Sequence, residues 1–228
     1  MIEADWMNVT FVHYEVEPAV LQPHVPFALD VREGRAYVSL VAFTQQKFRF
    51  AFGGALTAWA GALMANHRFL NVRTYVREGG IHFIAEWIPN RLTLWIAPRL
   101  YGLPCRLGRF DNGIVSDAAG SFACRVQRAE ELERCPPGSL DEFLLERYVA
   151  FTERRGVRRR FRVTHDPWPQ QRVGVEIVDD SLLRASFPWW PAARLVGANV
   201  SPGVPVTIGV PERLAWRTGV GALTRRWT

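Results

Sequence analysis

One short segment carries the polar side chains best suited to hold a ligand. From Asn71 to Val76 the residues alternate between two sets, Val72, Thr74 and Val76 in one and Asn71, Arg73 and Tyr75 in the other. Alternate residues of a strand share one face, so an amide, a guanidinium and a phenol would point the same way. A guanidinium binds a carboxylate or carbonyl oxygen through a planar pair of donors. The segment therefore predicts a ligand-binding pocket wall; the alternative is a buried arginine bonded to backbone carbonyls.

A second strand follows and carries two acid–base candidates. Gly79 and Gly80 supply the positive-φ positions of a hairpin turn, so residues 81–87 are expected to return antiparallel to the first strand. Regular alternation places His82 and Glu86 on one face, and both are weak catalytic candidates. No third ligand lies at a recognisable spacing. We therefore predict no metal site and expect an ordinary hydrogen-bonded strand histidine.

A capped helix and a sharp corner follow the second strand. Asn90 is a good N-cap residue. Helical spacing relates the apolar residues Leu92, Trp95, Ile96, Leu100 and Leu103. Pro98 is expected to kink or shorten the last turn, and Gly102 to end the helix. The corner then presents Cys105 and Arg106.

Cys105 is a weak candidate nucleophile and, with Arg106, a candidate ligand-binding residue. A neighbouring guanidinium lowers the pKa of a thiol and so raises its thiolate fraction. Against this, the corner follows a helix C-terminus, whose dipole disfavours a thiolate. The alternative role for Cys105 is packing against the pocket wall.

Four motifs give the chain a family resemblance. They are Asn-Val-Arg-Thr-Tyr-Val at 71–76, Gly-Leu-Pro-Cys-Arg at 102–106, His-Asp-Pro-Trp-Pro at 165–169 and Ser-Pro-Gly-Val at 201–204. In this order, and from about Trp6 to Leu214, the chain resembles the family called domain of unknown function 2071. That family is similar to acetoacetate decarboxylase, which implies a β-rich cone or barrel with a central ligand cavity.

The resemblance also implies that the decarboxylase chemistry is missing. Acetoacetate decarboxylases carry a Gly-aromatic-Pro-Lys-Lys corner whose first lysine forms a Schiff base; Cys105 stands at that position here, and Arg106 replaces the cationic neighbour. Their strand glutamate has no counterpart in the matching segment Phe69–Val76. The chain's one lysine, Lys47, lies in a polar segment outside the corner. We expect no Schiff-base decarboxylase and no cofactor.

Composition places the chain among globular cytoplasmic proteins. It has 228 residues, of which 48% are hydrophobic, and its longest apolar run, Ala51–Ala65, is too short to span a membrane. No charged-then-apolar signal segment opens the chain. The three cysteines, Cys105, Cys124 and Cys135, have neither metal-ligand spacing nor an even count, which suits a reducing compartment.

A net charge of +6 raises nucleic-acid binding as an alternative. In the segment 157–163, however, one set of alternate residues is entirely arginine and the other mostly apolar, as in an outer strand with a solvated cationic face: Arg158, Arg160 and Arg162 against Val157, Arg159, Phe161 and Val163. No nucleic-acid-binding motif accompanies them. We therefore expect no nucleic-acid partner, and the role of this arginine-rich strand stays open.

The succession of elements predicts one α+β domain, mostly antiparallel β, with a few peripheral helices around a cavity. Strands outnumber helices and follow one another through short turns, which does not suit parallel strands joined by crossover helices. The domain is expected to span residues 1–214, and residues 215–228 to form a frayed tail. The segment Ala51–Asn66 suits either a short helix or a flap over the pocket.

Further elements are placed by turn and cap signals. Strands are expected at residues 6–15, 36–43, 107–110, 114–116, 120–126, 157–164, 172–178, 182–187 and 205–210. Asn112 and Gly113 predict a type I′ hairpin turn. A capping box at Ser139 predicts a helix that ends near Thr152, and residues 29–31 are expected to form a hairpin with 36–43.

Two functions of different class remain. The first is a small-molecule binder whose ligand is a small organic acid or carbonyl compound, and it is favoured because no nucleophile, base and orienting group assemble from the sequence. The second is an enzyme with non-Schiff-base chemistry, a lyase, hydrolase or isomerase, using Cys105, Glu86 or His82. An interaction protein is the third alternative, and a homo-oligomer is left open.

Overall fold

The computed structural model describes residues 1–51, 61, 64 and 66–214. Most of the Ala51–Asn66 segment and the whole expected tail, 215–228, lie outside the described residues.

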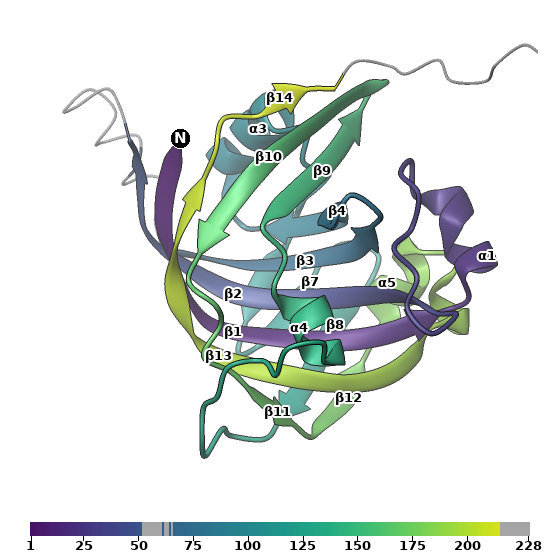
Figure 1. Cartoon of the computed structure of the whole chain (residues 1–228). Helices are drawn as coiled ribbons and strands as arrows, with labels where there is room; N and C mark the ends of the chain where they lie inside the picture. The colour runs from purple at the N-terminus through teal and green to yellow at the C-terminus, as the bar shows by residue number, and fades with distance from the viewer. Residues whose placement is uncertain (52–60, 62–63, 65, 215–228) are drawn as a thin grey trace, which may run out of the picture.

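A ring of long strands forms the centre of the molecule (Figure 1). Its members are β1 (Ile2–Val16), β2 (Ala36–Phe50), β3 (His67–Val76), β4 (Gly80–Ile88), β9 (Val149–Arg154), β10 (Val157–His165) and β13 (Arg194–Ile208). Neighbouring strands pair in the order β13-β1-β2-β3-β4-β9-β10, and β10 returns to β13 to close the ring. Only β4 and β9 pair in parallel within the ring. The mostly antiparallel, barrel-like fold expected from the sequence is confirmed.

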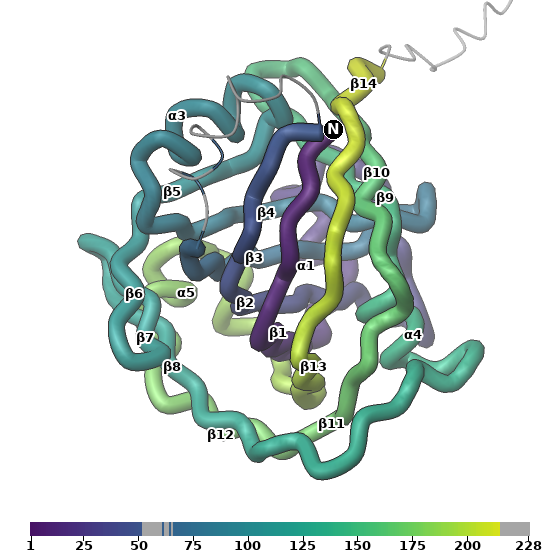
Figure 2. The backbone as a smooth tube through the Cα atoms, turned by 90° about the vertical axis from the view of Figure 1, so that its left-hand side faces the viewer, coloured from purple at the N-terminus to yellow at the C-terminus, as the bar shows by residue number. Residues whose placement is uncertain are grey.

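Smaller elements cover the ring. A second sheet has the order β12-β8-β7-β6 and lies beside the long strands (Figure 2). The bounds of the other strands are β5 Cys105–Leu107, β6 Arg109–Asp111, β7 Ile114–Ser116, β8 Ser121–Val126, β11 Gln171–Val173, β12 Val175–Asp179 and β14 Glu212–Arg213. The helices are α1 Pro18–Leu21, α3 Arg91–Leu100, α4 Leu140–Leu145 and α5 Ser181–Ser186, with 3-10 turns at Gln22–His24 and Trp190–Ala192.

Strand alternation divides the apolar side chains between two cores. Every strand of the ring contributes to one cluster, with Phe69 and Tyr75 from β3, so this cluster fills the ring's interior. Val72 and Val76 of the same strand belong instead to a cluster with Phe122 of β8, between the ring and the second sheet. The two-faced β3 strand expected from the sequence is therefore confirmed.

Two predicted elements are wrong in type or extent. The helix begun by Ser139 ends at Leu145, because the chain is already paired as strand β9 from Val149. Residues 182–186 are not a strand but belong to helix α5, which ends before Phe187 and turns Leu182 and Leu183 into the core between the ring and the second sheet. A strand would have sent these two adjacent side chains to opposite faces.

Other boundaries also differ. The strand expected at 172–178 is divided at Gly174 between β11 and β12, which belong to different sheets. The strand expected at 205–210 starts much earlier, at Arg194. The hairpin expected between residues 29–31 and 36–43 is also wrong, because Leu29 forms a β-bridge with Val76 of β3 and does not pair with β2. The type I′ turn is confirmed, since both of its central residues have positive φ between β6 and β7.

Helix α3 begins at Arg91, as the sequence predicts, and its N-cap residue is Asn90. The Asn90 side chain accepts a hydrogen bond from the Thr93 backbone N–H at 2.9 Å. Asn90→Ala is expected to lower the free energy of unfolding by about 1 kcal/mol, and Asn90→Asp by much less, because the carboxylate can also cap. Urea denaturation measures both; equal losses would contradict the capping role.

Candidate functional site

A cavity of about 90 Å³ lies inside the barrel, between β2, β3, β4 and helix α3. Its walls are mostly aromatic and aliphatic; they include Phe43, Phe48, Phe69, Phe83, Ile96 and Leu103. The polar side chains among the described lining residues are Gln45, Asn71, Glu86 and Thr93, together with the amphipathic rings of Trp6 and Tyr101. Mostly apolar walls with a few polar groups are typical of small-molecule sites.

A β-bulge decides which side chains of β4 face this cavity. In the β3–β4 ladder Val72 pairs with Ala85 but Arg73 pairs with Phe83, which leaves Ile84 as an extra residue. The bulge changes the alternation, so Phe83 and Glu86 both line the cavity. The expectation that His82 and Glu86 share one face is therefore wrong.

His82 lies on the other side of the sheet from the cavity. Its Nδ1 is 3.0 Å from the backbone carbonyl oxygen of Phe151, and its ring contacts Phe27. Burial lowers the pKa of His82 to about 4, so the imidazole is neutral at physiological pH. It sits as an ordinary hydrogen-bonded strand histidine.

Glu86 is the cavity's one acidic side chain among the described residues that line it, and only 6% of it is exposed. Burial raises the pKa of its carboxyl to about 7, and a hydrogen bond from Cys105 opposes this only in part. It forms no ion pair within the described part of the chain. At neutral pH a large share of this carboxyl is therefore protonated and able to donate a hydrogen bond or a proton.

Cys105 supports Glu86 from the neighbouring strand. β5 runs parallel to β4 and aligns Cys105 with Glu86, and the thiol donates to Glu86 Oε2 at 3.5 Å. Burial and the adjacent carboxyl raise the pKa of the Cys105 thiol well above its usual range. The group is a thiol at physiological pH, which suits a hydrogen-bond donor better than a nucleophile.

Asn71 faces Glu86 across the β3–β4 ladder. The two residues are direct register partners and both line the cavity. Within residues 1–51, 61, 64 and 66–214, no hydrogen-bond partner reaches the buried Oδ1 atom of Asn71. An unpartnered buried acceptor is costly unless something else supplies a donor.

Arg73 and Tyr75 continue the same inward face, but the structure places their polar ends elsewhere. Arg73 Nη2 donates to the backbone carbonyl of Leu144 at 3.0 Å, and the Tyr75 hydroxyl donates to the same oxygen at 2.8 Å. Neither side chain is among the described residues that line the cavity. Arg73 also lies over the Phe11 ring, and burial lowers its pKa.

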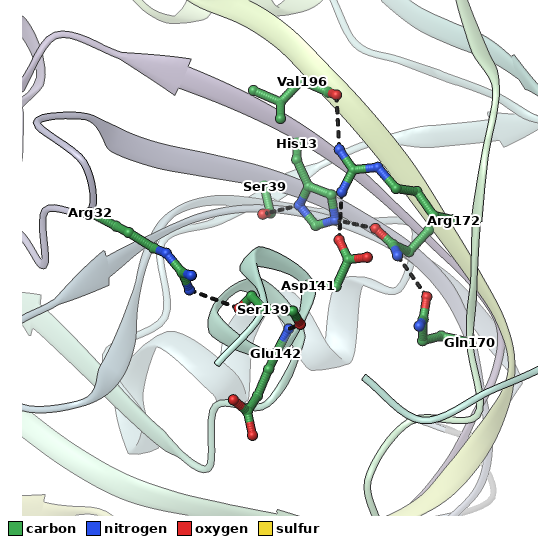
Figure 3. A network of polar contacts seen from close by, with 10 residues as sticks. His13, Arg32, Ser39, Ser139, Asp141, Glu142, Gln170, Arg172 and Val196 are labelled. Atoms are coloured by element: carbon green, nitrogen blue, oxygen red, sulfur yellow. Dashed lines mark hydrogen bonds and ion pairs between the residues drawn. The ribbon is translucent and has the colours of Figure 1, made fainter. Parts of the chain in front are cut away.

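A buried polar network that the sequence did not reveal begins at Ser39, whose hydroxyl is hydrogen-bonded to that of Tyr75. Figure 3 shows its members Ser39, His13 and Gln170. His13 Nδ1 lies 2.7 Å from Ser39 Oγ, and His13 Nε2 lies 3.1 Å from Asn199 Oδ1. Asn199 in turn donates to Gln170. Hydrolytic triads also place a histidine between a nucleophile and an orienting side chain, but they bond the nucleophile to Nε2 and the orienting group to Nδ1, the reverse of the arrangement here.

This network has the properties of an interior support. His13, Ser39 and Asn199 are each 0% exposed, and none lines a described cavity. Burial lowers the pKa of His13 to about 3. The signal that could have found the pair is strand register, since His13 and Ser39 are direct partners in the β1–β2 ladder.

Two cationic candidates lie outside the cavity. Arg106 is exposed, and its guanidinium lies over the rings of Trp87 and Phe187 and donates to Ser186 Oγ. The Lys47 side chain is 71% exposed and pairs with Asp5 at 2.7 Å. The structure thus brings together Asn71, Glu86 and Cys105, but not Arg106, His82 or Lys47.

The described residues offer neither a metal-ligand cluster nor a membrane-spanning helix. Among them, no cluster of three or more histidine, cysteine, aspartate or glutamate side chains could hold a metal ion. None of the described helices is long and apolar enough to cross a membrane.

The chain matches a known protein family over most of its length. It belongs to the family of uncharacterized conserved proteins called domain of unknown function 2071, which matches residues 3–205. The uncharacterized protein YqjF of Bacillus subtilis is 27% identical over 188 residues, which cover 75% of this chain and 76% of that protein. The family resemblance expected from the four motifs is confirmed.

Solved structures share the fold at low sequence identity. An acetoacetate decarboxylase-like enzyme from Sphingomonas wittichii RW1 is similar with a TM-score of 0.58 and 16% identity, covering 94% of this chain and 92% of that one. The enduracididine biosynthesis enzyme MppR, with HEPES buffer bound, gives a TM-score of 0.61 at 12% identity and coverage of 94% and 88%. These similarities confirm the acetoacetate decarboxylase-like fold and nothing finer.

Proposed function

We propose that this protein binds a small organic acid or carbonyl compound in the barrel cavity, with the ligand's polar end at Glu86 and Asn71. The observation that carries the proposal is a fully buried carboxyl in an apolar cavity with no charged partner among the described residues. A buried ionisable group without a structural partner is a functional-site candidate.

Two further observations support this proposal. MppR, which shares the fold, has been solved in complex with pyruvate, a small keto acid. The chain's one lysine is a solvent-exposed partner of Asp5, which suits binding without Schiff-base formation.

The three free cysteines fit a cytoplasmic location.

An enzyme with non-Schiff-base chemistry is the second candidate, and Glu86 is the observation that favours it. A carboxyl with a pKa near 7 can both give and take a proton at physiological pH, as a lyase or isomerase requires. Glu86→Gln separates the two candidates. In an enzyme it abolishes turnover while a binder keeps its affinity, because glutamine retains a donor and an acceptor but cannot exchange a proton.

Filling the cavity tests ligand binding directly. Ala97 of α3 lines the cavity, so Ala97→Phe is expected to occupy its space. Native mass spectrometry of the purified protein and a thermal-shift screen of keto, hydroxy and aromatic acids and amides would be run on both forms. We expect stabilisation of the unchanged protein by at least one compound, and loss of that shift in Ala97→Phe.

Arg91→Phe is the matched control, since it adds the same ring at an exposed position of the same helix. It is expected to keep the ligand-induced shift. If Ala97→Phe stays folded and is stabilised as strongly as the control, the ligand does not bind in this cavity.

A further inference from the structure

We propose that the ligand group bound by Glu86 and Asn71 is uncharged and sets a hydrogen-bond acceptor beside a donor, as a primary carboxamide does. This inference rests on the proposed function and narrows it, since it selects neutral carbonyl compounds over carboxylates.

The donor of the site is the protonated carboxyl of Glu86. Its Oε2 atom already accepts from the Cys105 thiol. The proton of the neutral acid is therefore expected on Oε1, where the cavity ligand can accept it. A ligand carbonyl oxygen is the natural partner for such a donor.

The acceptor of the site is Oδ1 of Asn71, which the described residues leave without a partner. Asn71 and Glu86 are opposite each other on adjacent antiparallel strands. The Cβ atoms of such pairs are roughly 5 Å apart, so both polar ends can reach one small head group. A donor and an acceptor side by side complement a carboxamide, which presents C=O beside N–H.

A carboxylate fits this site poorly. Of the described residues that line the cavity, none is an arginine or a lysine. Arg73 is the next inward residue on β3, and its Nη2 donates a hydrogen bond to the backbone carbonyl of Leu144. A carboxylate would lose its hydration without a counter-ion and would offer two acceptors to a site with an acceptor of its own.

The other titratable groups around Glu86 leave the site neutral. Cys105 on β5 remains a thiol, and burial raises the pKa of Tyr101, at the end of α3, to about 12. On β3, burial lowers the pKa of His67, which favours its neutral imidazole. On β9, the positive charge of Arg154 opposes the rise in the pKa of the Cys105 thiol. Arg154 and Cys105 line a second pocket, separate from the cavity.

Butyramide and butyrate, which differ in one terminal atom, test this inference. Affinities would be measured by ligand-observed NMR titration at pH 6 and pH 8.5. At pH 6 we expect butyramide to bind at least about tenfold more tightly than butyrate, the discrimination that one charge or hydrogen-bond mismatch gives. At pH 8.5 the affinity for butyramide is expected to be at least about tenfold lower than at pH 6, because Glu86 has then lost its proton.

Glu86→Gln is the control that assigns the pH dependence. It keeps a neutral donor and acceptor, so butyramide is expected to bind at both pH values with less than about threefold difference. Glu86→Leu removes both groups and is expected to abolish binding; its thermal melt shows whether it is folded. Persistent pH dependence in Glu86→Gln would remove Glu86 from the inference.

The outcomes also separate this inference from the proposed function. Tighter binding of butyrate than of butyramide at pH 6 would overturn the neutral head group while leaving a ligand-binding cavity. Binding of neither compound, together with no hit in the wider thermal-shift screen, would overturn both.

Discussion

Glu86→Gln is expected to raise the free energy of unfolding by about 3 kcal/mol at pH 8 and by little at pH 4. Burial raises the pKa of the Glu86 carboxyl from 4.5 to about 7 in the folded protein. One pKa unit corresponds to about 1.4 kcal/mol of folding free energy, so this difference yields the stated gain. Glutamine is neutral at every pH and carries no such cost.

The sign follows from proton binding by the two states. Between pH 4.5 and pH 7 the folded protein holds a proton on Glu86 that the unfolded chain has already released. Stability therefore falls as pH rises through this window, and this contribution is constant below and above it. The wild-type curve minus the Glu86→Gln curve isolates the effect from all other titrating groups.

Urea denaturation at pH 4, 5.5, 7 and 8 measures this difference. Glu78→Gln is the matched control, because Glu78 is an exposed residue of the turn that joins β3 to β4. Its substitution is expected to change stability by less than about 0.5 kcal/mol at each pH. Parallel pH curves for the wild type and Glu86→Gln would show that Glu86 is paired or hydrated in solution.

Features set by local sequence were predictable. The alternation of β3 predicted that Asn71, Arg73 and Tyr75 share one face. Asn90, a typical N-cap residue, predicted where α3 begins. Each of these depends on residues only a few positions apart, through strand periodicity or a helix cap. The family resemblance added the barrel and its cavity, which no local pattern contains.

Features set by contacts between distant strands were not predictable. The extra residue at Ile84 reverses the orientation of Glu86, and nothing in the hydrophobic pattern of β4 marks it. His13 meets Ser39 and Asn199 only because β1 lies between β2 and β13. The short apolar run of residues 182–187 predicts a strand where α5 lies, because such a run suits either element and only packing decides between them.

Arg73→Ala is expected to lower the free energy of unfolding by about 3 kcal/mol, whereas Arg73→Met keeps it at or above that of the wild type. Truncation to alanine empties a fully buried site and removes the packing on Phe11. Methionine restores most of the volume and removes a guanidinium that forms no ion pair within the described residues. The Leu144 carbonyl still accepts from Tyr75 in both variants.

Butyramide binding by the folded Arg73→Met protein then decides what the guanidinium does. The hydrogen bond to Leu144 predicts a structural role, so affinity is expected to stay within about threefold of the wild type. A loss of tenfold or more, with stability retained, would instead support the ligand contact that the strand pattern predicts. Arg73 would then have to release Leu144, and helix α4, which Arg172 ties to β13 through Asp141 and Val196 (Figure 3), would be the element that responds to the ligand.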